Sequence, residues 1–230
     1  QTAGCSLTAQ QPEINIARTG FQALAGVLGG TQSLHTNSMD ETLSLPTEKA
    51  AEIALRTQQL LAYETGVSNV VDPLGGSWFI EDLTDKIEKK ANEIFKEIDN
   101  YGGVINGIEE GYFQREISRS ACSYQKKVDN NERVVVGVNR FKNKHERVEI
   151  PTLEIDSRSE IDQIKKIKKF KEQRNHSAVD RYIEDIKRCC SNGRNLVPVV
   201  IEAAKNKLTL GEIVNAMKSE FGEWTESSVF

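Results

Sequence analysis

The fold is decided by one stretch of the sequence, Gly29-Gly30-Thr31-Gln32-Ser33-Leu34-His35-Thr36-Asn37-Ser38. Two glycines directly after the apolar residues 18–28 predict the end of a helix. Residues 31–36 then predict a short strand, and the polar residues 37–45 predict a loop. Because a loop after a buried strand lies at the carboxyl end of a sheet, its polar side chains are candidates for ligand binding.

The alternation of helix and strand continues beyond this stretch. Pro46 and Thr47 predict the start of a second helix, which has apolar residues at helical spacing and ends at Gly66. Residues 67–71 predict a second short strand. Helix, strand, helix and strand with short connections predict an α/β fold in which helices pack outside a parallel sheet.

The sequence after residue 77 has a mostly helical pattern, with one β-branched run at residues 134–138 that predicts a strand. Further helices are predicted at residues 83–98, 104–128, 195–207 and 209–221, and almost everything from residue 157 onward has a helical pattern. We therefore expect three parts: residues 1–128 with βα units and the helices after them, residues 129–156 as a strand and linker, and residues 157–230 as a helical extension.

Composition and charge restrict the class of protein. Of the 230 residues, 38% are hydrophobic and 28% are charged, which is enough apolar material for a folded core. The formal net charge of -4 gives no basic excess for binding nucleic acid or an anionic membrane, and no apolar run is long enough to cross a bilayer. The four cysteines form no Cys-x-x-Cys pair, so we expect reduced thiols and a cytoplasmic protein.

Standard catalytic motifs are missing from the sequence: it contains no Gly-x-Ser-x-Gly, no Gly-x-Gly-x-x-Gly, no P-loop and no His-Glu-x-x-His. What remains is a density of polar side chains. One group follows the first predicted strand, and a second precedes the first helix: Gln32, Ser33, His35, Thr36, Asn37, Asp40 and Glu41, and then Gln1, Thr2 and Gly4. Carboxamides, hydroxyls and a carboxylate suit hydrogen bonds to sugar hydroxyls, so chemistry here would need a cofactor. The alternative is that these residues cap helices and loops.

Several blocks of the sequence resemble the adenosylcobalamin-dependent methylmalonyl-CoA mutases. In chain order they are Gln1-Thr2-Ala3-Gly4, Leu7-Thr8-Ala9-Gln10, residues 29–38, Asp40-Glu41, Leu45-Pro46-Thr47, Asp72-Pro73 with Gly75-Gly76-Ser77, and Gly137-Val138-Asn139. The resemblance runs from Gln1 to about Arg140. It implies the carboxyl-terminal segment of the large, substrate-binding subunit: the last βα units of a (β/α) TIM-type barrel, followed by a mostly helical extension.

The resemblance also implies an activity. In this family the barrel holds an acyl-CoA along its axis and a separate module carries cobalamin. The reaction interconverts (R)-methylmalonyl-CoA and succinyl-CoA through an adenosyl radical, which the protein must hold in a water-free site.

Seven residues match cofactor-binding positions of the family. The resemblance gives Asn37 and Glu41 the adenosyl ribose, with Gln32 nearby. It gives Gly4 a backbone approach to the corrin and Gln1 a polar contact on the same face, while Ser44 and Leu45 line the cofactor edge. The sequence departs from the family at Cys5, Ile14 and Ser44, where Trp, Asn, and Ala or Gly are usual.

No catalytic residue and no metal ligand is assigned to this chain. The family's substrate-binding Arg, radical-guiding Tyr and catalytic His would all lie upstream of Gln1. None of the three histidines lies in an Asp-x-His-x-x-Gly pattern, so we expect another chain to supply the cobalt ligand. The chain is therefore not expected to be active alone.

The resemblance implies three partners: the upstream half of the barrel, a separate cobalamin-binding subunit and an acyl-CoA. Two alternatives stay open. One is a sibling mutase acting on isobutyryl-CoA, 2-hydroxyisobutyryl-CoA or ethylmalonyl-CoA, because the residues that distinguish the acyl group would lie upstream. The other is a non-catalytic assembly fragment.

Overall fold

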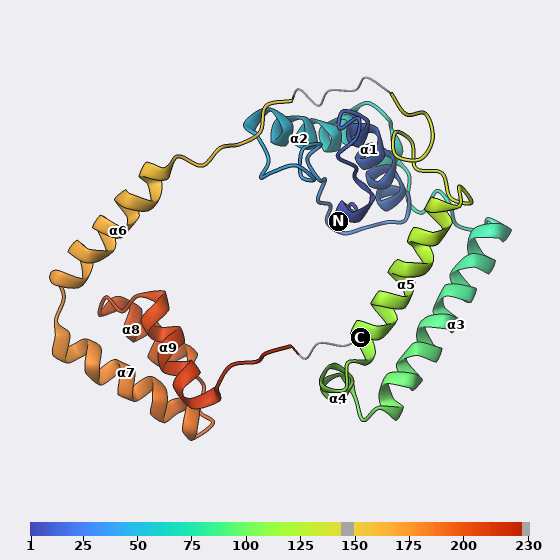
Figure 1. Cartoon of the computed structure of the whole chain (residues 1–230). Helices are drawn as coiled ribbons and strands as arrows, with labels where there is room; N and C mark the ends of the chain where they lie inside the picture. Colours follow the sequence, from blue (N-terminus) through green and yellow to red (C-terminus); the bar gives the residue numbers. More distant parts are fainter. Residues whose placement is uncertain (144–149, 227–230) are drawn as a thin grey trace. The chain divides into compact units, whose positions relative to one another are not determined.

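The computed structural model describes residues 1–143 and 150–226, and the chain divides into two compact units. The first unit is Gln1–Glu154 and the second begins at Ile155. The middle of the predicted linker and the last four residues of the predicted extension lie outside the described residues. The helices can be followed along the chain in Figure 1. Their bounds are η1 Gly4–Ser6, α1 Ile14–Leu28, α2 Glu48–Tyr63, η2 Val67–Asn69, α3 Trp78–Asn100, α4 Val104–Glu109, α5 Tyr112–Asp129, α6 Ser157–Glu172, α7 His176–Ser191, α8 Val197–Lys205 and α9 Leu210–Phe221.

The strand predicted at residues 31–36 is wrong. This segment forms neither helix nor strand. It makes one backbone hydrogen bond to the N-terminal segment, from the N–H of Thr2 to the carbonyl of His35 (3.0 Å). A sheet needs a ladder of such bonds to a neighbouring strand, and the described residues provide no such neighbour.

The other two predicted strands are also wrong. Residues 67–69 form the short helix η2, because Gly66 adopts a left-handed conformation (φ 70°) and its carbonyl accepts from the N–H of Asn69 (3.0 Å). At residues 134–138 the chain folds into a tight loop, which has one isolated bridge between Val136 and Arg140. The described residues thus show the helices of an α/β pattern without its sheet.

The helix predictions are confirmed, with one interruption. The helix predicted at residues 104–128 is two helices, α4 and α5, because Gly111 adopts a left-handed conformation (φ 70°) between them. The start predicted at Thr47 is correct, since the Thr47 side chain accepts a hydrogen bond from the N–H of Ala50 and caps α2.

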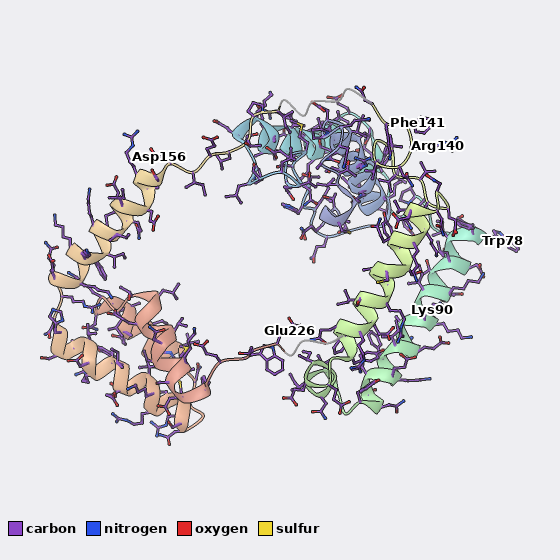
Figure 2. All side chains as sticks on the ribbon, viewed as in Figure 1. Trp78, Lys90, Arg140, Phe141, Asp156 and Glu226 are labelled. Carbon is purple, nitrogen blue, oxygen red and sulfur yellow. The ribbon has the colours of Figure 1, made fainter. Side chains whose placement is uncertain are left out.

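The core of the first unit contains small apolar side chains and an unusual share of buried polar ones. Ala23 and Ala50 are fully buried where α1 packs on α2. The buried polar residues are Thr2, Asn15, Thr19, Thr36, Asn37, Ser38 and Asp40. Helix α3, in contrast, buries none of its residues, and Figure 2 shows Trp78 projecting from its first turn, where it is 92% exposed.

The second unit has an apolar core between α7, α8 and α9. Its buried members are Val179, Ile186, Cys190, Ala203, Leu208, Ile213 and Ala216. Ile186 is fully buried at the centre. Helix α6, which precedes these three helices, buries none of its residues.

An ion pair joins the corner between α6 and α7 to the start of α9. The Arg174 guanidinium donates to both carboxylate oxygens of Glu212 (2.7 and 2.6 Å), and the Arg174 side chain is only 7% exposed. Glu212 also accepts from the N–H and hydroxyl of Thr209, which completes a capping box on α9. The hydrogen bonds from Arg174 are the main reason that the pKa of the Glu212 carboxyl lies well below its usual range.

We expect the stability of the second unit to fall as the pH decreases below the ordinary glutamate pKa of about 4.3. The folded state lowers the pKa of Glu212, so the stabilisation is present above the unfolded-state pKa and is lost as protons bind at lower pH. Glu212→Gln should cost about 3 kcal/mol at about pH 7 and flatten this dependence. Urea unfolding followed by the NMR signals of α7–α9 at about pH 7 and about pH 3 measures both effects.

The control for this prediction is Glu202→Gln, which removes a surface ion pair with Lys205 (2.7 Å). An exposed pair is worth less than about 1 kcal/mol, so this variant should keep nearly all of its stability and its pH dependence. Equal losses in the two variants would contradict the assignment to Glu212.

Candidate functional site

The two polar groups predicted from the sequence meet in the first unit. The Thr2 hydroxyl donates to Asn37 Oδ1 and accepts from the Asn37 N–H (2.9 Å), so each residue satisfies the other. Both residues are 5% exposed. The N-terminal loop and the loop after residue 36 therefore form one buried polar cluster, which neither segment forms alone.

Asn37 also holds Glu41, its neighbour in the same loop. Its Nδ2 donates to Glu41 Oε2 (2.5 Å), and the N–H of Ser38 donates to Glu41 Oε1 (2.8 Å). Both carboxylate oxygens thus rest on neutral donors, and the side chain is half-buried. A carboxylate in this setting keeps further lone pairs for a hydroxyl of a ligand.

Asp40 anchors the same loop to α2. Its Oδ2 accepts from the N–H and the hydroxyl of Thr47 (both 2.9 Å), the residue that caps the helix. Asp40 is fully buried, and its Oδ1 has no hydrogen-bond partner among the described residues. The loop is consequently fixed at both ends, by Thr2 on one side and by α2 on the other.

Helix α1 supports the loops from behind with polar side chains. Gln22 Oε1 accepts from the N–H of Ala3 (2.6 Å), while Gln22 Nε2 donates to the Ser6 hydroxyl (2.6 Å). Asn15 is fully buried and donates to the carbonyl of Met39 (2.9 Å). Asn15 was not among the predicted site residues, because it precedes the run 18–28 from which the first helix was predicted.

The seven residues predicted to bind a cofactor do not all come together. Gly4, Asn37 and Glu41 do: a Cβ added at Gly4 would lie 3.6 Å from Asn37 Nδ2. The other four residues lie outside this cluster. Gln1 and Gln32 are exposed, Ser44 donates to the carbonyl of Leu45 (2.9 Å), and Leu45 is 58% exposed.

Two kinds of site can be addressed from side-chain positions. Within residues 1–143 and 150–226, no group of three or more His, Cys, Asp or Glu side chains is arranged to hold a metal ion. In the same residues, no helix is both long and apolar enough to span a membrane. The polar cluster around Asn37 is the candidate ligand site, because the half-buried Glu41 carboxylate keeps lone pairs that can accept from a hydroxylated ligand.

Comparison with known proteins gives a consistent result. A family described as methylmalonyl-CoA mutase matches residues 1–223. The 2-hydroxyisobutanoyl-CoA mutase large subunit of Aquincola tertiaricarbonis is 40% identical over 231 residues, covering 100% of this chain and 41% of that protein. Methylmalonyl-CoA mutase of Rhizobium meliloti is 40% identical over 98% of this chain and 32% of its own length. The human mitochondrial methylmalonyl-CoA mutase is 41% identical over 97% of this chain and 30% of its own length. The chain thus spans less than half the length of these relatives.

Replacing Thr2 by Val tests how tightly the two loops are joined. The change keeps the shape but removes a hydroxyl that donates to Asn37 and accepts from it. We expect a loss of about 2 kcal/mol in the free energy of unfolding, because buried polar atoms of Asn37 lose their partner. Urea unfolding followed by the NMR signals of α1 and α2 measures it.

Thr84→Val is the matched control for this variant. The Thr84 hydroxyl donates to the carbonyl of Ile80 (2.8 Å) on the exposed surface of α3, so its loss should change stability by less than about 0.5 kcal/mol. If the two variants lose the same amount, the Thr2–Asn37 contact does not join the loops.

Proposed function

Because the chain belongs to the methylmalonyl-CoA mutase family, we propose that it is the carboxyl-terminal segment of a mutase large subunit, and that it works with adenosylcobalamin on an acyl-CoA. The observation that carries the proposal is the pairing of Asn37 with Glu41 at the positions where the family pattern has its ribose-binding residues. In the complete subunit, residues 1–128 would supply the last βα units of a TIM-type barrel.

The proposed substrate is (R)-methylmalonyl-CoA, interconverted with succinyl-CoA. The alternative substrate is 2-hydroxyisobutanoyl-CoA, since the mutase large subunit named for it and the Rhizobium meliloti methylmalonyl-CoA mutase have the same 40% identity to this chain. With either substrate the reaction would be a carbon-skeleton rearrangement of a short branched acyl-CoA.

The residues around Asn37 fit the adenosyl half of the cofactor. Each oxygen of Glu41 accepts one hydrogen bond from the loop and has a second lone pair, so the carboxylate can accept from the adjacent hydroxyls of a ribose. Gly4 is exposed next to Asn37 and has no side chain, so its backbone could be approached by a flat ring. Gln1, Gln32, Ser44 and Leu45 are proposed as outer contacts that the assembled enzyme would bring to the cofactor edge.

The family pattern assigns no cobalt ligand to this chain, since none of its three histidines lies in an Asp-x-His-x-x-Gly sequence. We therefore propose that a separate cobalamin-binding subunit supplies the cobalt ligand. When bound, adenosylcobalamin would supply the radical that removes a substrate hydrogen. The work of this chain would be to hold the ribose through Glu41 and Asn37 and to help exclude water.

The proposed partner for the first unit is the upstream half of the barrel, and α3 offers it a surface. Apolar residues recur on one face of α3 at helical spacing: Ile80, Leu83, Ile87, Ala91, Ile94 and Ile98. A hollow of about 640 Å³ runs along Leu83, Ile87 and Ile94, and Ile87 is 61% exposed. An apolar face of this length is expected to be covered in the complete protein.

The second unit is proposed to dock the cobalamin-binding subunit. Helix α6 has a row of basic side chains interspersed with exposed apolar ones such as Ile161 (50%) and Ile164 (48%). Charged rims of this kind steer association, so the docking should weaken as salt is added.

The ribose assignment is tested by Glu41→Gln in a mutase reconstituted from this chain, the upstream half and the cobalamin subunit. Loss of a charge-assisted hydrogen bond to a ribose hydroxyl should weaken adenosylcobalamin binding by about 1.5–3 kcal/mol and leave acyl-CoA binding nearly unchanged. Cofactor titration and the KM for the acyl-CoA measure the two effects. The control is Glu64→Gln at the exposed C-cap of α2. Unchanged cofactor affinity in Glu41→Gln would reduce Glu41 to a loop-stabilising carboxylate.

The partner surface is tested by Ile87→Glu on α3. A charge in the middle of an apolar interface should weaken association with the upstream half by about tenfold or more. Asp85→Lys, which helical spacing puts on the opposite face, is the control and should leave association nearly unchanged. Sedimentation of mixtures of the two halves gives the dissociation constants, and equal values for wild type and Ile87→Glu would rule out this surface.

A further inference from the structure

The motif Gly137-Val138-Asn139 lies far along the chain from the polar loop, yet a chain of hydrogen bonds connects them. We propose that the loop between Val135 and Phe141 positions the polar loop that contains Asn37 and Glu41, acting through Arg18 and Asn15. The identity of the ligand at Glu41 rests on the proposed function. The mechanical connection rests on the contacts alone.

The loop between Val135 and Phe141 is internally braced. The Asn139 side chain accepts from the N–H of Val135 (2.7 Å) and donates to the carbonyls of Val128 (2.8 Å) and Arg133 (2.7 Å). Gly137 donates to the carbonyl of Arg140 (2.8 Å) from a left-handed conformation (φ 83°). These bonds hold the loop as a rigid turn attached to the end of α5.

Two side chains from the N-terminal region donate hydrogen bonds to this turn. Arg18 Nη2 donates to the carbonyl of Val136 (2.8 Å), and Gln11 Nε2 donates to the carbonyl of Phe141 (3.1 Å). Gly137 approaches Gln11 so closely that an added Cβ would lie 3.1 Å from the Gln11 side chain. A side chain at position 137 would therefore displace the Gln11 side chain and also strain the turn.

From Arg18, the hydrogen bonds continue through Asn15 to the loop that contains Asn37 and Glu41. Arg18 Nη1 donates to Asn15 Oδ1 (2.8 Å), which also accepts from the N–H of Thr8 (3.0 Å). With its oxygen facing two donors, the Asn15 amide must turn its Nδ2 toward acceptors. It donates there to the carbonyls of Thr8 and Met39 (both 2.9 Å).

Met39 lies between the two residues that shape the candidate site. Ser38, on one side of it, donates its N–H to Glu41, and Asp40, on the other, anchors the loop to α2. A shift of the Met39 carbonyl would move both contacts. The hydrogen bond between Asn15 and Met39 thus positions the backbone next to Ser38, whose N–H donates to the Glu41 carboxylate.

A polar connection through a buried position indicates a positioning role in addition to packing. Asn15 is fully buried, and a buried amide is tolerated only when its partners are satisfied. A satisfied buried network specifies one geometry, whereas an apolar contact of similar size would allow several. Arg18 and Asn15 are accordingly positioning residues, since they reach the site only through Met39.

The connection is tested by Gly137→Ala and Asn15→Asp in the full chain. Gly137→Ala displaces the Gln11 side chain from the loop between Val135 and Phe141. Asn15→Asp places a carboxylate oxygen next to the Met39 carbonyl, and the two oxygens repel each other. Both should speed hydrogen exchange of the Ser38 amide by about tenfold, while amides in the middle of α2 keep their wild-type rates. Gly76→Ala is the control, because Gly76 has a similar left-handed conformation (φ 77°) with nothing within 4 Å of the added Cβ.

The result separates positioning from general destabilisation. Unchanged Ser38 exchange in both variants, or equal acceleration across α2, overturns the proposal. Gly137→Ala keeps the test decisive if Asn15→Asp does not fold, because it alters no side chain of the connection.

A second readout separates this proposal from the proposed function. In the reconstituted mutase, Asn15→Asp should raise the KM for adenosylcobalamin by about tenfold, with little change in kcat or in the KM for the acyl-CoA. Faster Ser38 exchange with an unchanged cofactor KM supports the connection and overturns the ribose assignment. A raised KM with unchanged Ser38 exchange overturns the connection.

Discussion

The candidate site depends on the hydrogen bonds made by the side-chain amide of Asn37. Its oxygen is fixed by the Thr2 hydroxyl and its nitrogen by the Glu41 carboxylate, so neither end is free to exchange roles. One buried amide therefore joins the N-terminal loop to the loop after residue 36. The approach of Gly4 to Asn37 and the orientation of Glu41 both follow from this bond.

The two units differ in the contacts that stabilise each of them, and this difference agrees with the proposed assembly. The second unit has a closed apolar core around Ile186, with Arg174 and Glu212 clamping its corner. The first unit buries polar side chains of α1 and of the loops around it, while α3 has a long apolar face and no buried residue. A unit built in this way would gain apolar burial if the proposed upstream half of the barrel covered α3.

The sequence predicted the helices and missed the site's supports, and both outcomes have a physical origin. Helix signals are local: Thr47 caps the helix that begins one residue later, and its partner Ala50 is three residues away. A strand requires a neighbour, and residues 31–36 lack one within the described chain, so their pattern did not produce a strand. The contact between Asn37 and Glu41 was predictable because the two residues share one loop. Arg18 was not, because its acceptor at Val136 is 118 residues away and no local pattern announces such a contact.

Two carboxylates of this chain illustrate how partners decide a role. Glu212 is held by the cations Arg174 and Lys171 as well as by Thr209, so its charge is neutralised within the fold and serves stability. Glu41 is held by an amide and a backbone N–H, which orient the carboxylate without cancelling its charge. A carboxylate held by neutral dipoles remains a strong acceptor for hydroxyl donors, and charge-assisted bonds of this kind are about twice as strong as neutral ones. The same residue type therefore stabilises a corner in one unit and, in the other, keeps lone pairs that a hydroxyl donor could use.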